Sequence, residues 1–484
     1  MSRALWEMRQ SGHFRTRTKI VCTIGPATCS PRMVERLIRA GMGVARLNLS
    51  HGTLQEHSRY AETIRRVSQR LGVPVAILMD LPGPKYRVGR LAEPVTLKKG
   101  ALLTLTPRQA SGERREVPIN LDTLSQGVKP GDTVLLDDGA MELKVKALQG
   151  GDVLCTVVVG GTLTSGRGIA VPGMRSIGPF VTEQLKGHIA FAAEQGPDFV
   201  ALSFVSSAQD VEQAREVLHQ GDAHIPIISK IERRAALSDF ARVLEASDGI
   251  MVARGDLGVD IPLDQVPIVQ KGLIEKCNRA GKPVITATQM LESMVKAASP
   301  SRAEVTDVAN AIFDGTDAVM LSSETSIGSY PIAAVRMMAR VALTTERALP
   351  YPQLLSERGQ GLKPHTDEAI SYTACHTASQ LGAAAIVAFT YSGSTAQRVS
   401  KYRPQAPILA VTPNEHVGRR LLLCWGVRAL SMGQPSSIEE MFALGATLPR
   451  ELGIARPGDL VVITGGLPIG IAGTTNLLKV ERVP

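Results

Sequence analysis

The chain has 484 residues, with 54 Lys or Arg against 45 Asp or Glu, so its formal net charge is +9. This excess is too small to define a nucleic-acid-binding protein, and aromatic residues, which stack on bases, make up only 4% of the chain. The 44% of apolar residues and the 45 glycines are typical of a large globular protein with an aliphatic core, whose length suggests about three domains.

An N-terminal segment, residues 1–17, precedes a region in which short β-branched runs alternate with amphipathic segments. Eight of these runs are predicted strands, at residues 19–25, 43–50, 74–81, 198–205, 226–232, 249–258, 283–290 and 318–325. Their β-then-α order and nearly continuous hydrophobicity favour a parallel (β/α)8 barrel over an open sheet. We assign residues 18–87 and 178–349 to this barrel.

The segments between the strands carry helix-end signals. Ser30 and Pro31 are the N-cap and first residue of one predicted helix, and Gly41 closes it. A second predicted helix begins with a capping box formed by Ser301 and Glu304. These ends support the alternation of strands and helices.

Two further regions differ from the barrel in pattern. Residues 88–177 contain alternating polar and apolar runs joined by Gly and Asp turns, which predict an inserted β domain. After a polar break near residues 350–366, residues 360–484 follow a helix-first α/β pattern. The predicted fold is therefore α/β, a (β/α)8 TIM barrel with an inserted small β-barrel domain and a C-terminal doubly wound α/β domain.

The cysteines and the apolar segments indicate the compartment. The six cysteines form no Cys-x-x-Cys pair and no Cys/His spacing that would bind zinc, so we expect reduced thiols. Neither the N-terminal segment nor the longest apolar stretch, residues 460–473, has the pattern of a signal peptide or a membrane-spanning helix. We therefore expect a cytoplasmic protein.

Polar residues follow the apolar bodies of several predicted strands. Arg46, Asn48 and Ser50 alternate with leucines and so share one face of the second strand. Lys230 and Glu232 share a face of the fifth strand by the same rule. A single charged residue near a loop is usually only solvated, but in a (β/α)8 barrel the carboxyl ends of the strands carry the chemistry. Repetition on several strands therefore predicts an active site there.

Two carboxylates of this set could bind one cation. Glu232 and Asp256 end adjacent predicted strands, whose backbones lie ~4.8 Å apart, so both could reach one Mg²⁺. Lys230 and Arg46 would add positive charge for an anionic ligand, and a glycine beside Asp256 would let backbone amides approach that anion. The alternative is a pair of structural salt bridges, Lys230 with Glu232 and Arg254 with Asp256.

Six sequence motifs resemble those of the pyruvate kinase family and occur in its order. They are RLNLSHG, ISKIE, MVARGDLGV, ITATQMLESM, RAEVTDVANAIFDGTDAVMLSSET and SKYRP. The resemblance covers almost the whole chain and implies a barrel, a β lid inserted after the third strand, a C-terminal regulatory domain and a homotetramer. It also implies a glycolytic activity, phosphoryl transfer from phosphoenolpyruvate to ADP, which gives pyruvate and ATP.

The resemblance also implies roles for residues at the strand ends. Glu232 and Asp256 would bind Mg²⁺ (or Mn²⁺), while Lys230 and Arg46 would offset charge on the substrate and on the transferring phosphoryl group. Because the protein acts in such a reaction by positioning and electrostatics, removing Lys230 should lower the rate on the order of 10²-fold or more.

The substrate carboxylate and the enolate would have their own partners. Amides near Gly255 and Asp256, with the Thr288 hydroxyl, would hold the carboxylate. Thr288, through a water molecule, is the candidate proton relay to the enolate, and its alternative role is a capping hydroxyl at the turn after the strand.

Nucleotide binding resembles the family at His51 and Arg87, and at Arg167 of the inserted domain, where the family often has Lys. The sequence contains no GxxxxGK[ST] loop. A P-loop fold is therefore not expected, whereas ADP binding through arginines and a lid is compatible with the sequence.

The chain departs from the family near its monovalent-cation site. Many members need K⁺ near the positions of Asn48, Ser50, Asp80 and Leu81 and have Glu where this chain has Lys85. A fixed ammonium there could replace K⁺, so we predict activity without added K⁺. The alternative is that Lys85 only pairs with Asp80 or with a surface carboxylate.

Two more residues depart from the family pattern. Ser323 and Ile327 stand where the family more often has Gly and Lys, and the sequence does not show what these two differences change.

A loop in the C-terminal region resembles the family's site for activating sugar phosphates. The hydroxyls and amides of Thr390, Ser392, Gly393, Ser394 and Thr395 follow a predicted strand and precede a predicted helix, an arrangement that suits a phosphate. Tyr391 stands where members that respond to fructose 1,6-bisphosphate tend to have Lys. We therefore expect AMP or a sugar monophosphate as activator, the alternative being a turn without a ligand.

Two other classes of function are compatible with part of this pattern. Another Mg²⁺-dependent TIM-barrel lyase or mutase acting on phosphoenolpyruvate or pyruvate could use the same carboxylates and cations. A metabolite sensor without catalysis would be expected to lack Lys230 or a metal carboxylate, and all three are present. The inserted domain and the loop at residues 390–395 favour the kinase.

Overall fold

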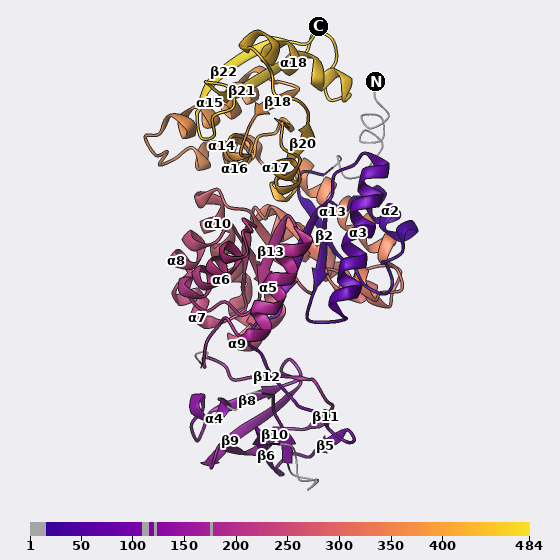
Figure 1. Ribbon diagram of the computed structural model, residues 1–484, viewed down its shortest axis with the longest axis vertical. Helices are drawn as coiled ribbons and strands as arrows, with labels where there is room; N and C mark the ends of the chain where they lie inside the picture. The colour runs from indigo at the N-terminus through magenta and orange to yellow at the C-terminus, as the bar shows by residue number, and fades with distance from the viewer. Residues whose placement is uncertain (1–15, 109–115, 121–122, 175–177) are drawn as a thin grey trace. The chain divides into compact units, whose positions relative to one another are not determined.

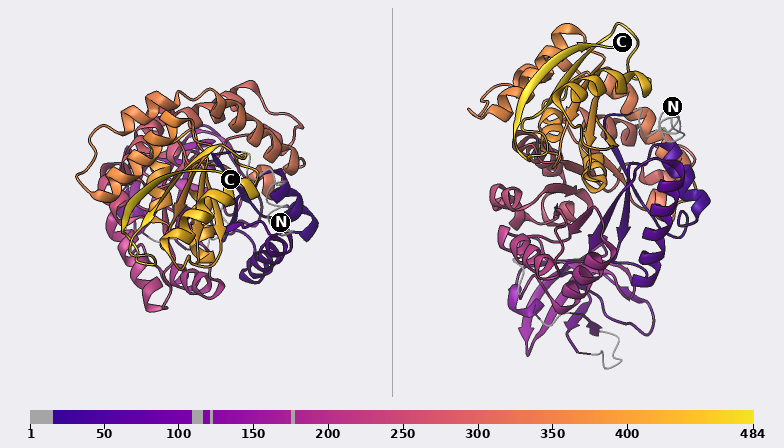
Figure 2. Two further views of the ribbon diagram at one scale, coloured as in Figure 1. Left: turned by 90° about the horizontal axis from the view of Figure 1, so that it is seen from above. Right: turned by 45° about the horizontal axis from the view of Figure 1, so that its top comes forward.

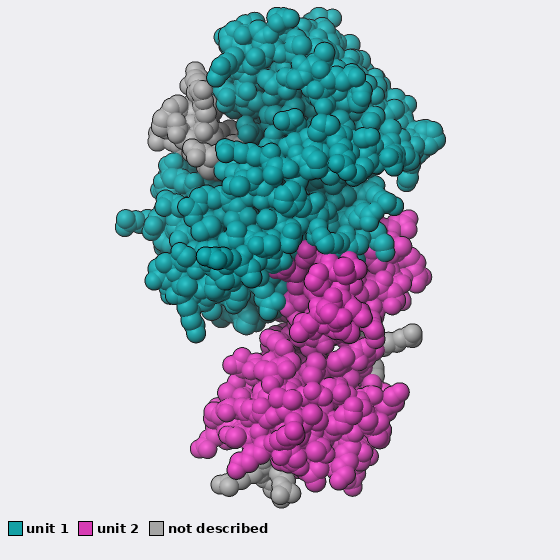
Figure 3. Space-filling view, turned by 180° about the vertical axis from the view of Figure 1, so that it is seen from behind, with its two compact units in different colours: residues 1–80, 194–200, 271–484 teal, residues 81–193, 201–270 magenta. Residues whose placement is uncertain are grey.

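The computed structural model describes residues 16–108, 116–120, 123–174 and 178–484. The chain forms two compact units, one of residues 1–80, 194–200 and 271–484 and the other of residues 81–193 and 201–270 (Figure 3). Most of the predicted N-terminal segment, residues 1–15, lies outside the described residues.

Eight strands close into a barrel in the order β1-β17-β16-β15-β14-β13-β3-β2, as the sequence predicts. Their bounds are β1 Lys19–Thr23, β2 Val44–Asn48, β3 Ala76–Leu81, β13 Phe199–Leu202, β14 Ile227–Ile231, β15 Gly249–Ala253, β16 Val284–Ala287 and β17 Ala318–Leu321. Almost all of these strand residues are buried, which explains why the strands read as continuous apolar runs rather than as alternating ones. The predicted strands 249–258 and 318–325 are too long, because short helices begin at Arg254 and Ser323.

Helices follow the barrel strands (Figure 1). They are α2 Pro31–Ala40, α3 Leu54–Leu71, α5 Glu183–Gln195, α6 Ala208–Gln220, α7 Arg234–Ser238, α8 Phe240–Ala246, α9 Arg254–Asp260, α10 Val266–Ala280, α11 Arg302–Phe313, α12 Ser323–Ser326 and α13 Pro331–Arg347. Ser30 caps α2, Gly41 ends it with a φ of 126°, and Ser301 forms the predicted capping box with Glu304. These three local predictions are confirmed.

The inserted region forms a seven-stranded sheet in the order β4-β12-β8-β9-β10-β6-β7 and a two-stranded ribbon, β11-β5. The bounds are β4 Tyr86–Arg87, β5 Val95–Leu97, β6 Leu102–Thr106, β7 Glu116–Pro118, α4 Leu124–Gly127, β8 Thr133–Leu136, β9 Met141–Gln149, β10 Asp152–Val159, β11 Gly161–Leu163 and β12 Gly168–Ala170. Alternate residues of β9 and β10 enter one apolar core, as their period-two pattern predicts.

The C-terminal region is a five-stranded sheet in the order β20-β19-β18-β21-β22 (Figure 2). The bounds are α14 Tyr351–Arg358, α15 Thr366–Leu381, β18 Ala385–Phe389, α16 Ser394–Lys401, β19 Ile408–Thr412, α17 Glu415–Arg420, β20 Val427–Ser431, α18 Ile438–Glu451, β21 Leu460–Gly466 and β22 Thr475–Arg482. Only β22, the long yellow edge strand, is antiparallel to its neighbour among these five. The strand order reverses at β18, and in such sheets ligands bind at the carboxyl ends beside this reversal.

Within the described part of the chain, the helices are all too short or too polar to cross a membrane.

Candidate active site

The end of β14 carries a buried lysine and a buried carboxylate. Lys230 is 8% exposed and Glu232 is 1% exposed, and the Lys230 Nζ lies 2.9 Å from the Glu232 Oε1. The same Nζ donates to the Ser203 Oγ at 2.8 Å, while the second carboxylate oxygen of Glu232 accepts the Phe204 backbone N–H at 2.6 Å. The predicted common face of Lys230 and Glu232 is therefore present, and two residues that follow β13 hold both groups in place.

Asp256 lies in the first turn of α9, directly after β15. Its Oδ1 forms a 2.6 Å ion pair with the Lys85 Nζ, and Asp138 of the inserted sheet lies 3.7 Å from the same ammonium. Asp256, Glu232, Lys85 and Asp138 line one pocket of the second unit. The sequence predicts Lys85 as a fixed ammonium in place of K⁺, with pairing to Asp80 or to a surface carboxylate as the alternative. In the structure its ammonium forms the ion pair with Asp256.

The carboxylates of this pocket suit a divalent cation whose other coordination positions are filled by water or by a substrate. β14 and β15 are neighbouring parallel strands, so Glu232 and Asp256 follow two adjacent strand ends. Among the described residues there is no cluster of three or more His, Cys, Asp or Glu arranged to hold a metal ion. Mg²⁺ is often bound through one or two carboxylates, with the other positions left to water and phosphate, so these residues fit Mg²⁺.

Phe204 was not predicted as a site residue, yet it contacts two that were, Lys85 and Glu232. Its φ of 60° is in the left-handed region, which costs an aromatic residue about 1–3 kcal/mol. Its ring centroid lies 5.3 Å from the Lys85 Nζ and 5.2 Å from the Arg233 Cζ. Burial lowers the pKa of the Arg233 guanidinium, and nearby Asp260 opposes that shift. Phe204 and Ser203 could have been found from the sequence only as residues at a strand's carboxyl end.

The first unit brings together the residues predicted on the second and third strands. The Arg46 Nε donates to the Asp80 Oδ2 at 2.8 Å and its Nη1 donates to the Thr23 Oγ1 at 2.9 Å, all in the buried interior. Asn48 is the strand partner of Asp80, and its Oδ1 accepts the Ser50 backbone N–H at 3.3 Å. Leu81, the last residue of β3, is the first residue of the second unit.

Thr288, also in the first unit, has an unusual backbone. Its φ is 62° and that of Gln289 is 55°. For a β-branched residue this conformation is a genuine outlier, and such strain is concentrated at functional sites. The Thr288 Oγ1 donates to the Ala287 carbonyl at 2.7 Å.

Glu324, which the sequence did not single out, is fully buried in the same unit. Burial raises the pKa of its carboxyl group, and the Leu291 and Ser322 amides donate hydrogen bonds to it.

The residues predicted to bind nucleotide lie in both units. In the second unit, the Val88 backbone N–H donates to the Arg167 carbonyl, so Arg87 and Arg167 belong to adjoining chain segments. The Arg167 Nη1 pairs with the Asp137 Oδ1 at 3.0 Å, and the Arg87 Nη1 donates to the Gly166 carbonyl at 3.0 Å. In the first unit His51 is exposed, and its carbonyl accepts from the His57 ring.

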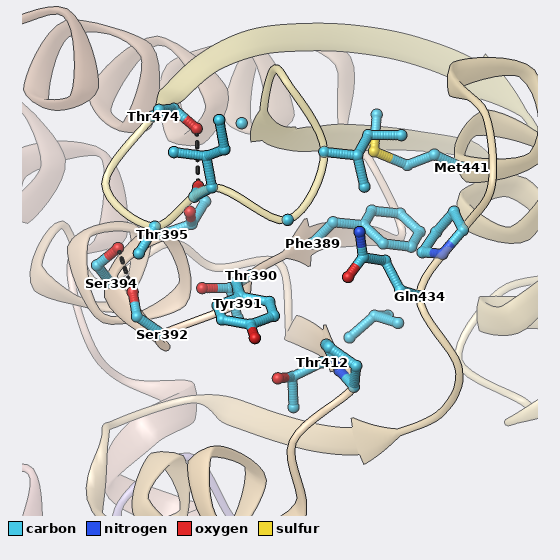
Figure 4. A pocket seen from close by; sticks show the side chains of 18 of the residues that line it. Phe389, Thr390, Tyr391, Ser392, Ser394, Thr395, Thr412, Gln434, Met441 and Thr474 are labelled. Atoms are coloured by element: carbon cyan, nitrogen blue, oxygen red, sulfur yellow. Dashed lines mark hydrogen bonds between the residues drawn. The ribbon is translucent and has the colours of Figure 1, made fainter.

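A pocket lies at the carboxyl ends of β18, β19 and β21, beside the reversal in strand order (Figure 4). Thr390, Ser392, Ser394 and Thr395 line it, and Gly393, with a φ of 94°, is the N-cap of α16. The Thr390 Oγ1 accepts the Gly393 N–H at 2.9 Å. The described residues that line this pocket include no charged side chain.

Comparisons with known proteins give the relationship of the whole chain. Residues 15–335 match the family model described as pyruvate kinase, barrel domain, and residues 368–481 match the pyruvate kinase alpha/beta domain. A pyruvate kinase of Geobacillus stearothermophilus is 47% identical over 97% of this chain and 81% of its own length. One of Clostridium acetobutylicum is 43% identical over 96% of this chain and 99% of its own length. The chain therefore belongs to the pyruvate kinase family of phosphotransferases.

Proposed function

We propose that the protein transfers the phosphoryl group of phosphoenolpyruvate to ADP and releases pyruvate and ATP, as in glycolysis. The observation that carries this proposal is the buried Lys230–Glu232 pair, which adjoins a pocket that Glu232 shares with Asp256. A coupled assay that follows pyruvate formation tests it, because the rate should depend on both phosphoenolpyruvate and ADP. A lyase or mutase acting on the same substrate would form product without ADP.

Lys230 is proposed to offset the negative charge that is redistributed during phosphoryl transfer. Its ammonium is already oriented by Ser203 and Glu232, so little reorganisation is needed when the substrate is present. Replacing Lys230 by methionine should lower kcat on the order of 10²-fold or more. Arg46, which Asp80 and Thr23 orient, is proposed to contact the substrate as a second cation.

Glu232 and Asp256 are proposed to hold Mg²⁺ or Mn²⁺, which when bound would supply positive charge for the anionic substrate. The Phe204 amide fixes the orientation of the Glu232 carboxylate, and Lys85 contacts that of Asp256. Mn²⁺ binding followed by electron paramagnetic resonance should weaken at least tenfold in Glu232→Gln. Unchanged Mn²⁺ affinity in that variant would contradict the assignment.

The product side of the reaction requires a proton at the enolate carbon. Thr288 is proposed to relay it through a water molecule, and the backbone amides near Gly255 and Asp256 to hold the substrate carboxylate. The strained backbone of Thr288 supports a functional role. Thr288→Ser should keep most of the rate of pyruvate formation, whereas Thr288→Val should lower the exchange of pyruvate methyl protons with solvent at least tenfold.

His51, Arg87 and Arg167 are proposed to bind ADP. Arg167 is half-exposed and pairs with Asp137, so its guanidinium is close to the surface of the inserted sheet. Arg167→Lys should change KM for ADP by less than threefold, and Arg167→Ala should raise it more, because a single cation suffices for a diphosphate at an exposed position.

Lys85 is proposed to replace the monovalent cation that many family members need near Asn48, Ser50, Asp80 and Leu81. Its ammonium is largely buried and is shared by two carboxylates, which supports a fixed rather than a mobile charge. Turnover should therefore not depend on K⁺. Loss of turnover in K⁺-free buffer that is restored by titrating K⁺ would contradict this proposal.

The pocket beside β18 is proposed to bind a phosphorylated activator at residues 390–395. Because its described lining is uncharged, the phosphate would rely on hydroxyls and amides, which favours AMP or a sugar monophosphate over a bisphosphate. Activation by AMP, ribose 5-phosphate and fructose 1,6-bisphosphate should be compared in the wild type and in Thr395→Glu. Because Thr395 is buried against Thr475, the exposed variant Ser392→Glu provides a second test in which folding is undisturbed.

The family relationship also supports a homotetramer and a three-part division into a barrel at residues 18–87 and 178–349, a lid at residues 88–177 and a regulatory domain at residues 360–484. Sedimentation velocity should give four times the chain mass of 51.6 kDa. A monomer at micromolar concentration would contradict the oligomeric state.

A further inference from the structure

Phe204 has a backbone conformation that is unfavourable for an aromatic residue. A glycine would adopt the φ of 60° at less cost than an aromatic residue. The backbone N–H of any residue other than proline could donate to Glu232, so that hydrogen bond does not explain the ring. The ring must therefore contribute something that offsets the strain.

The ring contacts two cations. One belongs to the chain segment at residues 83–85, and the other is hydrogen-bonded to that segment. The Lys85 Nζ and the Arg233 Cζ each lie within 5.3 Å of its centroid, a distance at which a cation is attracted to an aromatic ring. Arg233 also donates to the Pro84 carbonyl at 2.9 Å. At Gly83 a Cβ atom would lie 2.1 Å from the Ser203 carbonyl oxygen and 3.3 Å from the Phe204 Cβ. The chain just before Lys85 is thus packed directly on Ser203 and Phe204.

Gly168, in β12 of the inserted sheet, packs directly against the Lys85 side chain. A Cβ atom built at Gly168 would lie 2.9 Å from the Lys85 Cε and 3.3 Å from its Nζ. The backbone of Gly168 is not in the left-handed region, so its conformation does not require glycine. The missing side chain leaves the space that the Lys85 ammonium occupies on its way to Asp256.

We propose that Phe204 and Gly168 are positioning residues that fix the Lys85 ammonium against Asp256. Phe204 attracts the ammonium through the ring, and Gly168 leaves its path open. The proposal deepens the role assigned above to Lys85 and rests on Lys85 taking part in the reaction.

The test is a set of double-mutant cycles in the full-length protein. Phe204→Leu removes the aromatic ring, Gly168→Ala fills the path, and Lys85→Met removes the ammonium. Each single variant should lower kcat at least fivefold, and Phe204→Tyr should keep at least half of the wild-type kcat. In the Lys85→Met background the other two changes should lower kcat by less than twofold, because the group on which they act is absent.

A matched control is Gly161→Ala in the same inserted region. Its Cβ would lie 2.8 Å from the Met141 Cγ, a contact as close as the one at Gly168 but with an uncharged side chain, so kcat should stay within twofold of the wild type. The proposal is overturned if Phe204→Leu and Gly168→Ala lower kcat as much without Lys85 as with it, or if Gly168→Ala, which keeps every charge and ring, leaves kcat unchanged. A K⁺ requirement in the wild type would refute the replacement of K⁺ but would leave the outcome of these cycles valid.

Discussion

Replacing Arg419 by alanine should destabilise the first unit, because its guanidinium holds a fully buried carboxylate. The Asp198 side chain is 0% exposed, and its Oδ1 accepts the Arg419 Nε at 2.8 Å. Its Oδ2 accepts the Arg65 Nη1 at 3.2 Å and the Ile77 N–H at 2.8 Å. These bonds tie α17, α3 and β3 to the residue that precedes β13.

The expected loss of unfolding free energy depends on which hydrogen bonds each variant removes. Arg419→Ala removes a short charge-assisted bond whose donor is 16% exposed, a loss of about 1.5–3 kcal/mol. Arg65→Ala removes a longer bond to Asp198 and a bond to the Gly196 carbonyl from a side chain that is 32% exposed, where screening reduces the loss to about 0.5–1.5 kcal/mol. In the double variant, the Ile77 amide is the one donor to Asp198 that remains of Arg419, Arg65 and Ile77. The loss of unfolding free energy in the double variant should therefore exceed the sum of the losses in the two single variants.

Urea unfolding followed by circular dichroism, under identical conditions for all variants, measures these differences. Glu415→Ala is the control, because Glu415 is 81% exposed and lies 3.8 Å from Arg419. Its effect should be below about 0.5 kcal/mol. An Arg419→Ala variant that is no more destabilised than Glu415→Ala, or an Arg65→Ala variant that loses more stability than Arg419→Ala, would show that Arg419 is not the main partner of Asp198.

Three further outcomes are expected. Burial lowers the pKa of Lys19 from 10.5 to about 8, so the folded protein binds fewer protons there than the unfolded chain, and stability rises as the pH increases from about 8 to 10.5. Between pH 7 and pH 10.5, the free energy of unfolding of the wild type should therefore gain about 3 kcal/mol relative to Lys19→Met, and parallel pH profiles would contradict this. Lys85→Glu should make turnover depend on added K⁺, which a K⁺ titration measures, and equal rates with and without K⁺ would argue against the role of Lys85. Ser301→Ala should lower the free energy of unfolding by about 1 kcal/mol, since it removes the cap of α11, while Ser301→Asp should retain it.

The barrel and many helix ends could be predicted from the sequence because their signals are local. Apolar runs of strand length and the caps at Ser30, Gly41 and Ser301 depend on residues a few positions apart. The strand ends at Ala253 and Leu321 were misplaced, since the helices that follow them begin without a strong capping signal.

Within the candidate site, sequence reasoning found the residues that share a strand or end neighbouring strands. Lys230 and Glu232 were placed together by the period of two along a strand, and Asp256 by the order of the barrel. The partner of Lys85 was not predictable, because Asp256 lies 171 residues further along the chain. Phe204 was missed for a related reason, since its function comes from its backbone conformation and from two cations brought to it by the fold.

Lys230, held by Glu232 and Ser203, is proposed to promote phosphoryl transfer from phosphoenolpyruvate to ADP. The direct measurement is the initial rate of ADP-dependent pyruvate formation by the wild type and by Lys230→Met, with equal thermal stability verified for both. The wild type should turn over, and the variant should lose on the order of 10²-fold or more in kcat. A wild type that forms no pyruvate with ADP would contradict the proposed activity, and a folded variant that keeps more than about a tenth of the rate would contradict the role of Lys230.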